Sequence, residues 1–235
     1  MFVSLRATRL ALGAVVAILL HPACTAPDRA GDTPGPTETR PRRTVVLPAP
    51  VDPGMSLHEA LRDRRSVREY RDEPLADEIL ATLMWAAQGR TQDGASGRTA
   101  PSAGGTYPLE VYVATAEGVQ RYLPDGHRAE RWSEVDLRPA LHAASGGQPW
   151  VLEAPAVVVI TAVPGRTEAR YGARAERYAT LEAGHAAQNV LLQATALGLG
   201  AVPVGAFADE AVGAALDLPA GEAARYLIPV GRPLS

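Results

Sequence analysis

Residues 178–199 form the longest periodic segment of the chain, and this segment constrains the fold more than any other feature. The residues on its overlapping faces are Leu181, His185, Gln188, Leu191, Leu192 and Thr195. Apolar residues at this spacing are typical of a helix, and Gly198 and Gly200 end the pattern. We therefore expect one long central helix.

The other elements mix strand and helix patterns. Strands are expected at residues 109–116, 119–123, 128–132, 156–162, 201–204 and 226–230. Helices are expected at residues 56–64, 75–87, 135–144 and 208–216. The strand and helix patterns do not alternate in the regular βαβ order of a parallel sheet, so the sequence predicts an α+β fold.

The N-terminus has the layout of a secretory signal. Arg6 and Arg9 precede an apolar run over residues 10–20, and Pro22-Ala23-Cys24 follows. The run is shorter than the roughly 20 residues that span a bilayer. We expect residues 1–24 to be a signal peptide and Cys24 to be lipidated, which tethers the protein on the extracytoplasmic side of a bacterial membrane. Ordinary cleavage that leaves Cys24 incidental, or an uncleaved weak anchor, are the alternatives.

Residues 25–54 contain seven prolines and predict an extended linker. The folded domain is expected over residues 55–235. A formal net charge of −3 gives no basic field for nucleic acid, so no such partner is expected. The five histidines show no metal-ligand spacing, and no metal site is expected.

Four segments can carry chemistry. Residues 64–68 read Arg-Arg-Ser-Val-Arg, and guanidinium forks bind phosphate oxygens well, although such a run is often a solvated surface. Residues 100–108 form a glycine-bearing loop that leads into a strand, and its backbone can approach a flat ring or simply connect two elements. Residues 182–189 place polar side chains in the long helix, where Glu182 is expected to hydrogen-bond His185. Residues 198–207 end that helix in a second glycine-rich turn.

In this order and spacing the segments resemble the nitroreductase family of FMN-dependent oxidoreductases, and within it the SagB-type thiazole/oxazole dehydrogenase branch. The resemblance covers roughly residues 56–233. It implies an α/β/α sandwich with a central, mostly antiparallel sheet and a long central helix. It also implies a homodimer with FMN bound between the subunits, two-electron hydride transfer, and NAD(P)H as a possible electron donor.

The resemblance also assigns site residues. Those implied to bind the cofactor are Arg64, Arg65, Ser66, Arg68, Pro101, Ser102, Gly104, Gly105, Pro203, Val204, Gly205 and Arg232. The 101–105 loop is implied to reach the flavin of the partner subunit, and the 203–205 turn to place a backbone amide near the flavin nitrogen that exchanges hydride. The resemblance implies either that Arg232 substitutes for the basic tail of other family members or that this contact is missing here.

Arg170-Tyr171 stands where azoline-oxidising relatives of the SagB type carry a Lys-Tyr pair, and the two are the implied catalytic residues. Arginine stays protonated at ordinary pH and is a poor general base, so oxidation of peptide azolines is doubtful. The expected substrate is a small organic molecule or a modified peptide. The alternative function is a non-catalytic exported lipoprotein that uses the fold to bind flavin or another ligand.

Overall fold

The computed structural model describes residues 42–91 and 97–235, so the predicted signal peptide and Cys24 lie outside the described residues. A seven-stranded sheet runs in the order β1-β4-β3-β2-β5-β7-β6, and every neighbouring pair is antiparallel. The strands are β1 (Thr44–Val46), β2 (Leu109–Thr115), β3 (Gly118–Leu123), β4 (Arg128–Ser133), β5 (Ala156–Ala162), β6 (Gly200–Ala201) and β7 (Ala223–Gly231).

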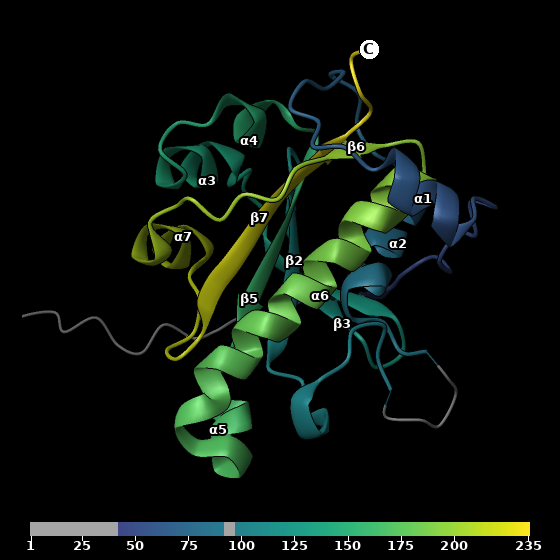
Figure 1. Ribbon diagram of the computed structural model, residues 1–235. Coiled ribbons are helices and arrows are strands. Elements are labelled where there is room, and N and C mark those ends of the chain that lie inside the picture. Colours follow the sequence, from purple (N-terminus) through teal and green to yellow (C-terminus); the bar gives the residue numbers. More distant parts are fainter. Residues whose placement is uncertain (1–41, 92–96) are drawn as a thin grey trace, which may run out of the picture. The chain divides into compact units, whose positions relative to one another are not determined.

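Helices cover both faces of this sheet (Figure 1). The helices are α1 (Leu57–Asp63), α2 (Asp77–Gln88), α3 (Arg138–Ala144), α4 (Pro149–Glu153), α5 (Gly165–Tyr171), α6 (Ala175–Ala196) and α7 (Asp209–Leu216). The predicted α+β sandwich, with its antiparallel sheet and long helix, is confirmed. The sequence patterns missed β1, α4 and α5, which are all short. None of the helices in residues 42–91 and 97–235 combines the length and the apolarity needed to cross a membrane.

The long helix α6 packs on one face of the sheet together with α2 (Figure 1). Its buried side is largely alanine, with Ala179, Ala183 and Ala186 against the sheet. Leu181, one of the residues that define the sequence pattern, is instead 53% exposed. Helical periodicity thus predicted α6 correctly, but not all of its larger apolar residues lie on its buried side.

The opposite face of the sheet is covered by α3, α4 and α7. Side chains alternate along the strands, so that Val111 faces α6 while Tyr112 faces the second layer. β5 is fully buried along its whole length between the two layers, as its continuous β-branched run predicted.

Within the stretch predicted to be a linker, residues 44–51 contact the domain. β1 adds to the sheet edge beside β4, and the Val51 amide donates to Thr82 Oγ1 at 2.9 Å. His127 Nε2 lies 2.7 Å from the carbonyl oxygen of Pro48. Proline-rich composition indicated a chain without helices, but an extended chain on a sheet edge satisfies the same composition.

Candidate functional site

The 64–68 segment lies beside β6. α1 starts at a capping box between Ser56 and Glu59 and stops at Asp63, after which the chain turns extended. The Val67 amide then donates to the carbonyl oxygen of Ala201 at 3.1 Å. A Cβ atom on Gly200 would lie 2.5 Å from Val67 Cβ, so this close approach requires glycine.

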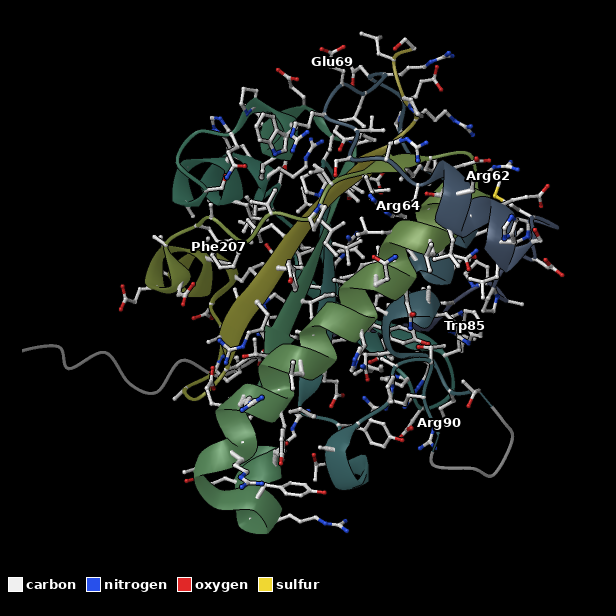
Figure 2. All side chains as sticks on the ribbon, in the orientation of Figure 1. Arg62, Arg64, Glu69, Trp85, Arg90 and Phe207 are labelled. Atoms are coloured by element: carbon white, nitrogen blue, oxygen red, sulfur yellow. The ribbon has the colours of Figure 1, made fainter. Side chains whose placement is uncertain are left out.

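The three arginines of the segment carry charge without a carboxylate partner among the described residues. Arg65 Nη1 donates to the carbonyl oxygens of Arg62 and Arg64, at 2.7 and 2.8 Å. Arg68 lies over the Trp150 ring at 5.2 Å from its centroid. Arg65, Ser66 and Arg68 are exposed, and Arg64 is half-buried near the C-terminal end of α6 (Figure 2). This end of the sheet therefore offers several unpaired cationic donors.

Arg232 reaches the same end of the sheet through the backbone. The Arg71 amide donates to the Arg232 carbonyl oxygen at 2.9 Å, and the Leu234 amide donates to the Glu69 backbone carbonyl oxygen at 3.1 Å. The Arg232 side chain is already directed at Glu73, with 3.4 Å between Nε and Oε2. Both groups are about half exposed, so this ion pair is weak and leaves the guanidinium available for exchange.

The 203–205 turn follows β6 at the same end. Val204 and Leu227 exchange backbone hydrogen bonds of 2.8 and 3.0 Å, which bury the Val204 side chain. Pro203 and Gly205 are exposed on either side of it. Gln148 Nε2 donates to the Ala206 carbonyl oxygen at 2.9 Å and fixes the chain beyond the turn. The structure thus brings together the 64–68 segment, the 203–205 turn and Arg232.

The 101–105 loop lies elsewhere, beside the N-terminal half of α6. Gly104 and Gly105 have φ of +60° and +66°, which favours glycine at both positions. Arg170 Nη1 donates to the Gly104 carbonyl oxygen at 3.0 Å. A Cβ on Gly104 would come within 2.8 Å of both Arg170 Nη1 and Tyr171 Oη. The structure therefore joins this loop to the Arg170-Tyr171 pair, a contact that the sequence did not predict.

Within one chain the two clusters remain apart. The 101–105 loop sits near Glu182 on α6, whereas the 64–68 segment contacts the chain just beyond the end of that helix at Ala196. At a rise of about 1.5 Å per residue, that stretch of α6 is roughly 20 Å long. Each chain therefore carries two separate half-sites.

Glu182 is the polar residue whose importance the sequence missed. The residue is only 3% exposed, while His185 is exposed and makes no hydrogen bond with it among the described residues, so the predicted Glu182–His185 pair is wrong. Burial raises the pKa of Glu182 to about 7, although the Ser102 hydroxyl, the Arg98 guanidinium and the Gln88 amide oppose the shift. Glu182 lies three residues after Ala179 and four before Ala186, on the buried side of α6. This spacing is the one feature of the sequence that indicated its burial.

Two further cavities are found among the described residues. One of about 710 Å³ lies between residues 50–57, α2 and the C-terminal half of α6, and includes Trp85. The other, of about 570 Å³, also borders Trp85 and Arg90, which Figure 2 labels. It extends to His127. Neither contains a residue of the 64–68 segment, the 101–105 loop or the 203–205 turn.

Comparison with known proteins gives consistent matches. The model of the nitroreductase family matches residues 61–232. A candidate nitroreductase of Methanocaldococcus jannaschii is 41% identical over 195 residues, which cover 80% of this chain and 97% of that protein. The FMN reductase (NAD(P)H) of Bacillus subtilis is 29% identical over 160 residues, which cover 63% of this chain and 53% of that enzyme. This chain thus spans about half of the Bacillus enzyme. A crystal structure of a candidate nitroreductase of Ralstonia eutropha matches with a TM-score of 0.73 and 34% identity, over 82% of this chain and 90% of that one.

Proposed function

Because this chain belongs to the nitroreductase family, we propose that it is an oxidoreductase that uses FMN to move two electrons as a hydride to or from a small organic or peptide-derived substrate. Family membership supports the oxidoreductase. The match to an FMN reductase supports the choice of cofactor. The observation that carries the proposal is the convergence of unpaired arginines and an exposed glycine turn at one end of the sheet.

The residues at this end fit the phosphate of FMN. Arg64, Arg65 and Arg68 have no carboxylate partner in the described part of the chain, and Ser66 adds a neutral donor beside them. Guanidinium forks and hydroxyls bind phosphate oxygens through charge-assisted hydrogen bonds. Arg232 adds a fourth cation if its weak pair with Glu73 opens.

The exposed backbone of the 203–205 turn suits close contact with the flat flavin ring of the same cofactor. Pro203 and Gly205 are exposed, and glycine leaves the backbone amide open to close approach. When bound, FMN supplies the hydride chemistry, and the protein contributes position and electrostatics. The turn would hold the edge of the cofactor, and the 64–68 segment would hold its phosphate.

The second half-site completes the pocket in a homodimer, which we propose as the working assembly. The 101–105 loop, with Arg170 and Tyr171 behind it, is too far along α6 to serve the arginines of its own chain. A partner chain can bring this loop over the cofactor through a two-fold interface. The cofactor would then lie between the subunits, so neither chain alone encloses it.

Arg170 and Tyr171 have different roles in this proposal. Arg170 cannot remove a proton, and it donates to the Gly104 carbonyl oxygen, so it holds the 101–105 loop in place. The Tyr171 ring packs edge-on against the Tyr178 ring, with 5.0 Å between the ring centroids. This contact fixes the orientation of the Tyr171 side chain. Its hydroxyl is the group that can hold or donate a proton to a substrate. This pairing favours a small electron acceptor over a peptide azoline, which needs a base.

NAD(P)H is the proposed electron donor, and it would have to approach the cofactor from outside, since the chain lacks a Gly-x-Gly-x-x-Gly turn of its own for a dinucleotide. Export through the signal sequence and attachment through a lipidated Cys24 remain proposals from the N-terminal sequence. In that case FMN is acquired after export.

The test is a visible absorption spectrum of the full chain purified in the presence of FMN. We expect a yellow protein that bleaches under anaerobic titration with NAD(P)H and recovers on addition of a quinone or nitroaromatic. A protein that stays colourless contradicts the proposal and leaves a ligand-binding module without catalysis. A yellow protein that cannot be reduced leaves flavin binding without enzymatic activity.

Substitution separates phosphate binding from general charge effects. Arg64→Ala should weaken FMN binding about tenfold or more, the cost of a lost charge-assisted hydrogen bond, and should weaken riboflavin binding much less because riboflavin has no phosphate. Arg62→Ala is the matched control, since Arg62 lies two residues away in the last turn of α1 and pairs with Asp63 (Figure 2). Fluorescence titration gives both affinities. Equal losses for FMN and riboflavin would remove Arg64 from the phosphate site.

A further inference from the structure

Glu182 sits under the 101–105 loop in an incompletely bonded polar cluster. Its Oε1 atom is buried and has no hydrogen-bond partner among the described residues. Gln88 Nε2, from α2, is likewise buried without a partner, while Gln88 Oε1 accepts a 2.9 Å hydrogen bond from Arg98 Nη1. The Arg98 bond fixes the orientation of the amide, because a guanidinium can only donate. Buried polar groups left unpaired in this way are rare and often functional.

Ser102 connects this cluster to the exposed loop. Its Oγ accepts a hydrogen bond from the Tyr107 amide at 2.8 Å, across the two glycines and a Tyr107 backbone with φ of +46°. This leaves one lone pair and the hydroxyl hydrogen for a second partner, and the carboxyl of Glu182 is within their reach. Ser102 is half-buried, whereas Glu182 beneath it is 3% exposed. The hydroxyl can therefore point inward to the carboxyl or outward to a ligand, but not both.

We propose that Glu182 is a positioning residue whose protonation state decides whether Ser102 donates its hydroxyl hydrogen inward to the carboxylate or outward to a ligand held against the 101–105 loop. An ionised Glu182 only accepts, so it draws the hydroxyl hydrogen inward. A protonated Glu182 donates its own hydrogen to Ser102 Oγ and frees the hydroxyl to donate outward. Only one proton is gained or lost, and no covalent bond changes.

The groups around Glu182 set the pH at which it gains or loses its proton near neutral. Burial raises the pKa of Glu182 to about 7. The charged group that faces it is Arg98, and the polar groups are Ser102 from the loop and Gln88 from α2. Burial lowers the pKa of Arg98, but arginine stays protonated throughout this range. Glu182 is therefore the group in this cluster that changes charge.

The inference rests on the proposed flavin site, because the ligand that Ser102 would meet is the FMN of the partner chain. In the wild type, we expect FMN affinity to fall about threefold to tenfold between about pH 6 and about pH 8, beyond changes common to all variants, as Ser102 turns inward and one hydrogen bond is lost. In Glu182→Gln the amide donates to Ser102 Oγ at every pH, so affinity should stay high. In Ser102→Ala affinity should stay low.

The experiment measures FMN dissociation constants by fluorescence at both pH values for these proteins and for Glu210→Gln, a control on α7. The FMN phosphate itself titrates near about pH 6, so the decisive quantity is the ratio of each variant to the wild type, in which that effect cancels. A ratio of Glu182→Gln to wild type that does not change with pH overturns the inference while leaving flavin binding intact.

A second readout needs no flavin. Infrared difference spectra of the protein alone should show one carboxyl band that titrates near about pH 7, is missing in Glu182→Gln, and moves to higher pH in Ser102→Ala, which removes a hydrogen bond that lowers the pKa. A band unaffected by Ser102→Ala overturns the coupling between the two residues. If this coupling is present and no variant binds FMN, the proposed function fails. The donation of Ser102 to FMN then fails as well, while its coupling to Glu182 stands.

Discussion

At the scale of single residues, the domain places one carboxyl where burial opposes its charge. Glu182 is 3% exposed, and its folded pKa is raised to about 7 from the ordinary value of 4.5. Between these two values the folded state binds more protons than the unfolded state. The contribution of Glu182 to the stability of the domain therefore falls as pH rises through this range and levels off above about pH 7.

Glu182→Gln should remove this loss. The variant should match the wild type in stability at about pH 4.5 and exceed it by up to about 3 kcal/mol at about pH 8, since it carries no charge to bury. Urea unfolding followed by circular dichroism at several pH values checks the difference. Glu210→Gln, on an exposed residue of α7, should show no such trend. An equal gain at every pH would mean that Glu182 is not the titrating group.

At the scale of elements, contact between the 64–68 segment and β6 positions the arginines. This contact depends on Gly200, where an added Cβ would fall 2.5 Å from the branched Val67 side chain. A β-branched side chain has few rotamers with which to move away. The segment and the strand can therefore stay paired only if this position has no side chain.

Gly200→Ala should push the 64–68 segment away from β6. We expect a loss of about 1–3 kcal/mol in stability and a weaker FMN complex, because overpacking displaces the backbone that carries the arginines. Gly213→Ala is the matched control: Gly213 lies in α7 with open space around its Cβ position, and alanine there should be neutral or stabilise by about 0.5–1 kcal/mol. Thermal unfolding and FMN titration test both variants. Unchanged FMN affinity in Gly200→Ala would separate β6 pairing from the cofactor site.

At the scale of the whole molecule, the proposed cofactor pocket combines half-sites from two chains. The arginines and the 203–205 turn lie at one end of α6, and the 101–105 loop lies nearer the other. A two-fold dimer can combine the first half-site of one chain with the second half-site of its partner. Such a composite pocket is consistent with the open surfaces at both places.

Complementation between two defective variants tests this arrangement. Arg64→Ala and Gly104→Ala should each bind FMN poorly, because one loses the phosphate contact and the other forces the loop away from Arg170. Unfolding the two together and refolding them should restore about one quarter of the sites, since random pairing gives half heterodimers with one intact pocket each. Sedimentation measures the dimer, and FMN titration counts the sites. A dimer without restored sites would place both half-sites of one pocket on a single chain.

Local sequence determined most of the elements and the family. The β-branched run of β5, the capping box at Ser56 and Glu59, and the helical spacing in α6 each depend on neighbouring residues, so their patterns could be recognised directly. Short elements such as α4, with five residues, carry too little periodicity to detect. Prolines likewise concealed β1, because composition does not tell a free extended chain from an edge strand.

The tertiary structure alone decided which of the recognised segments meet. Arg232 pairs with Arg71, shortly after the 64–68 segment, across more than a hundred residues. Arg170 holds Gly104, and Glu182 is buried near Ser102. Periodicity reports the local conformation of the backbone and gives no information about contacts between distant residues. The sequence therefore determined the kinds of chemical group available, and the packing of α6 against the sheet decided their separation into two half-sites.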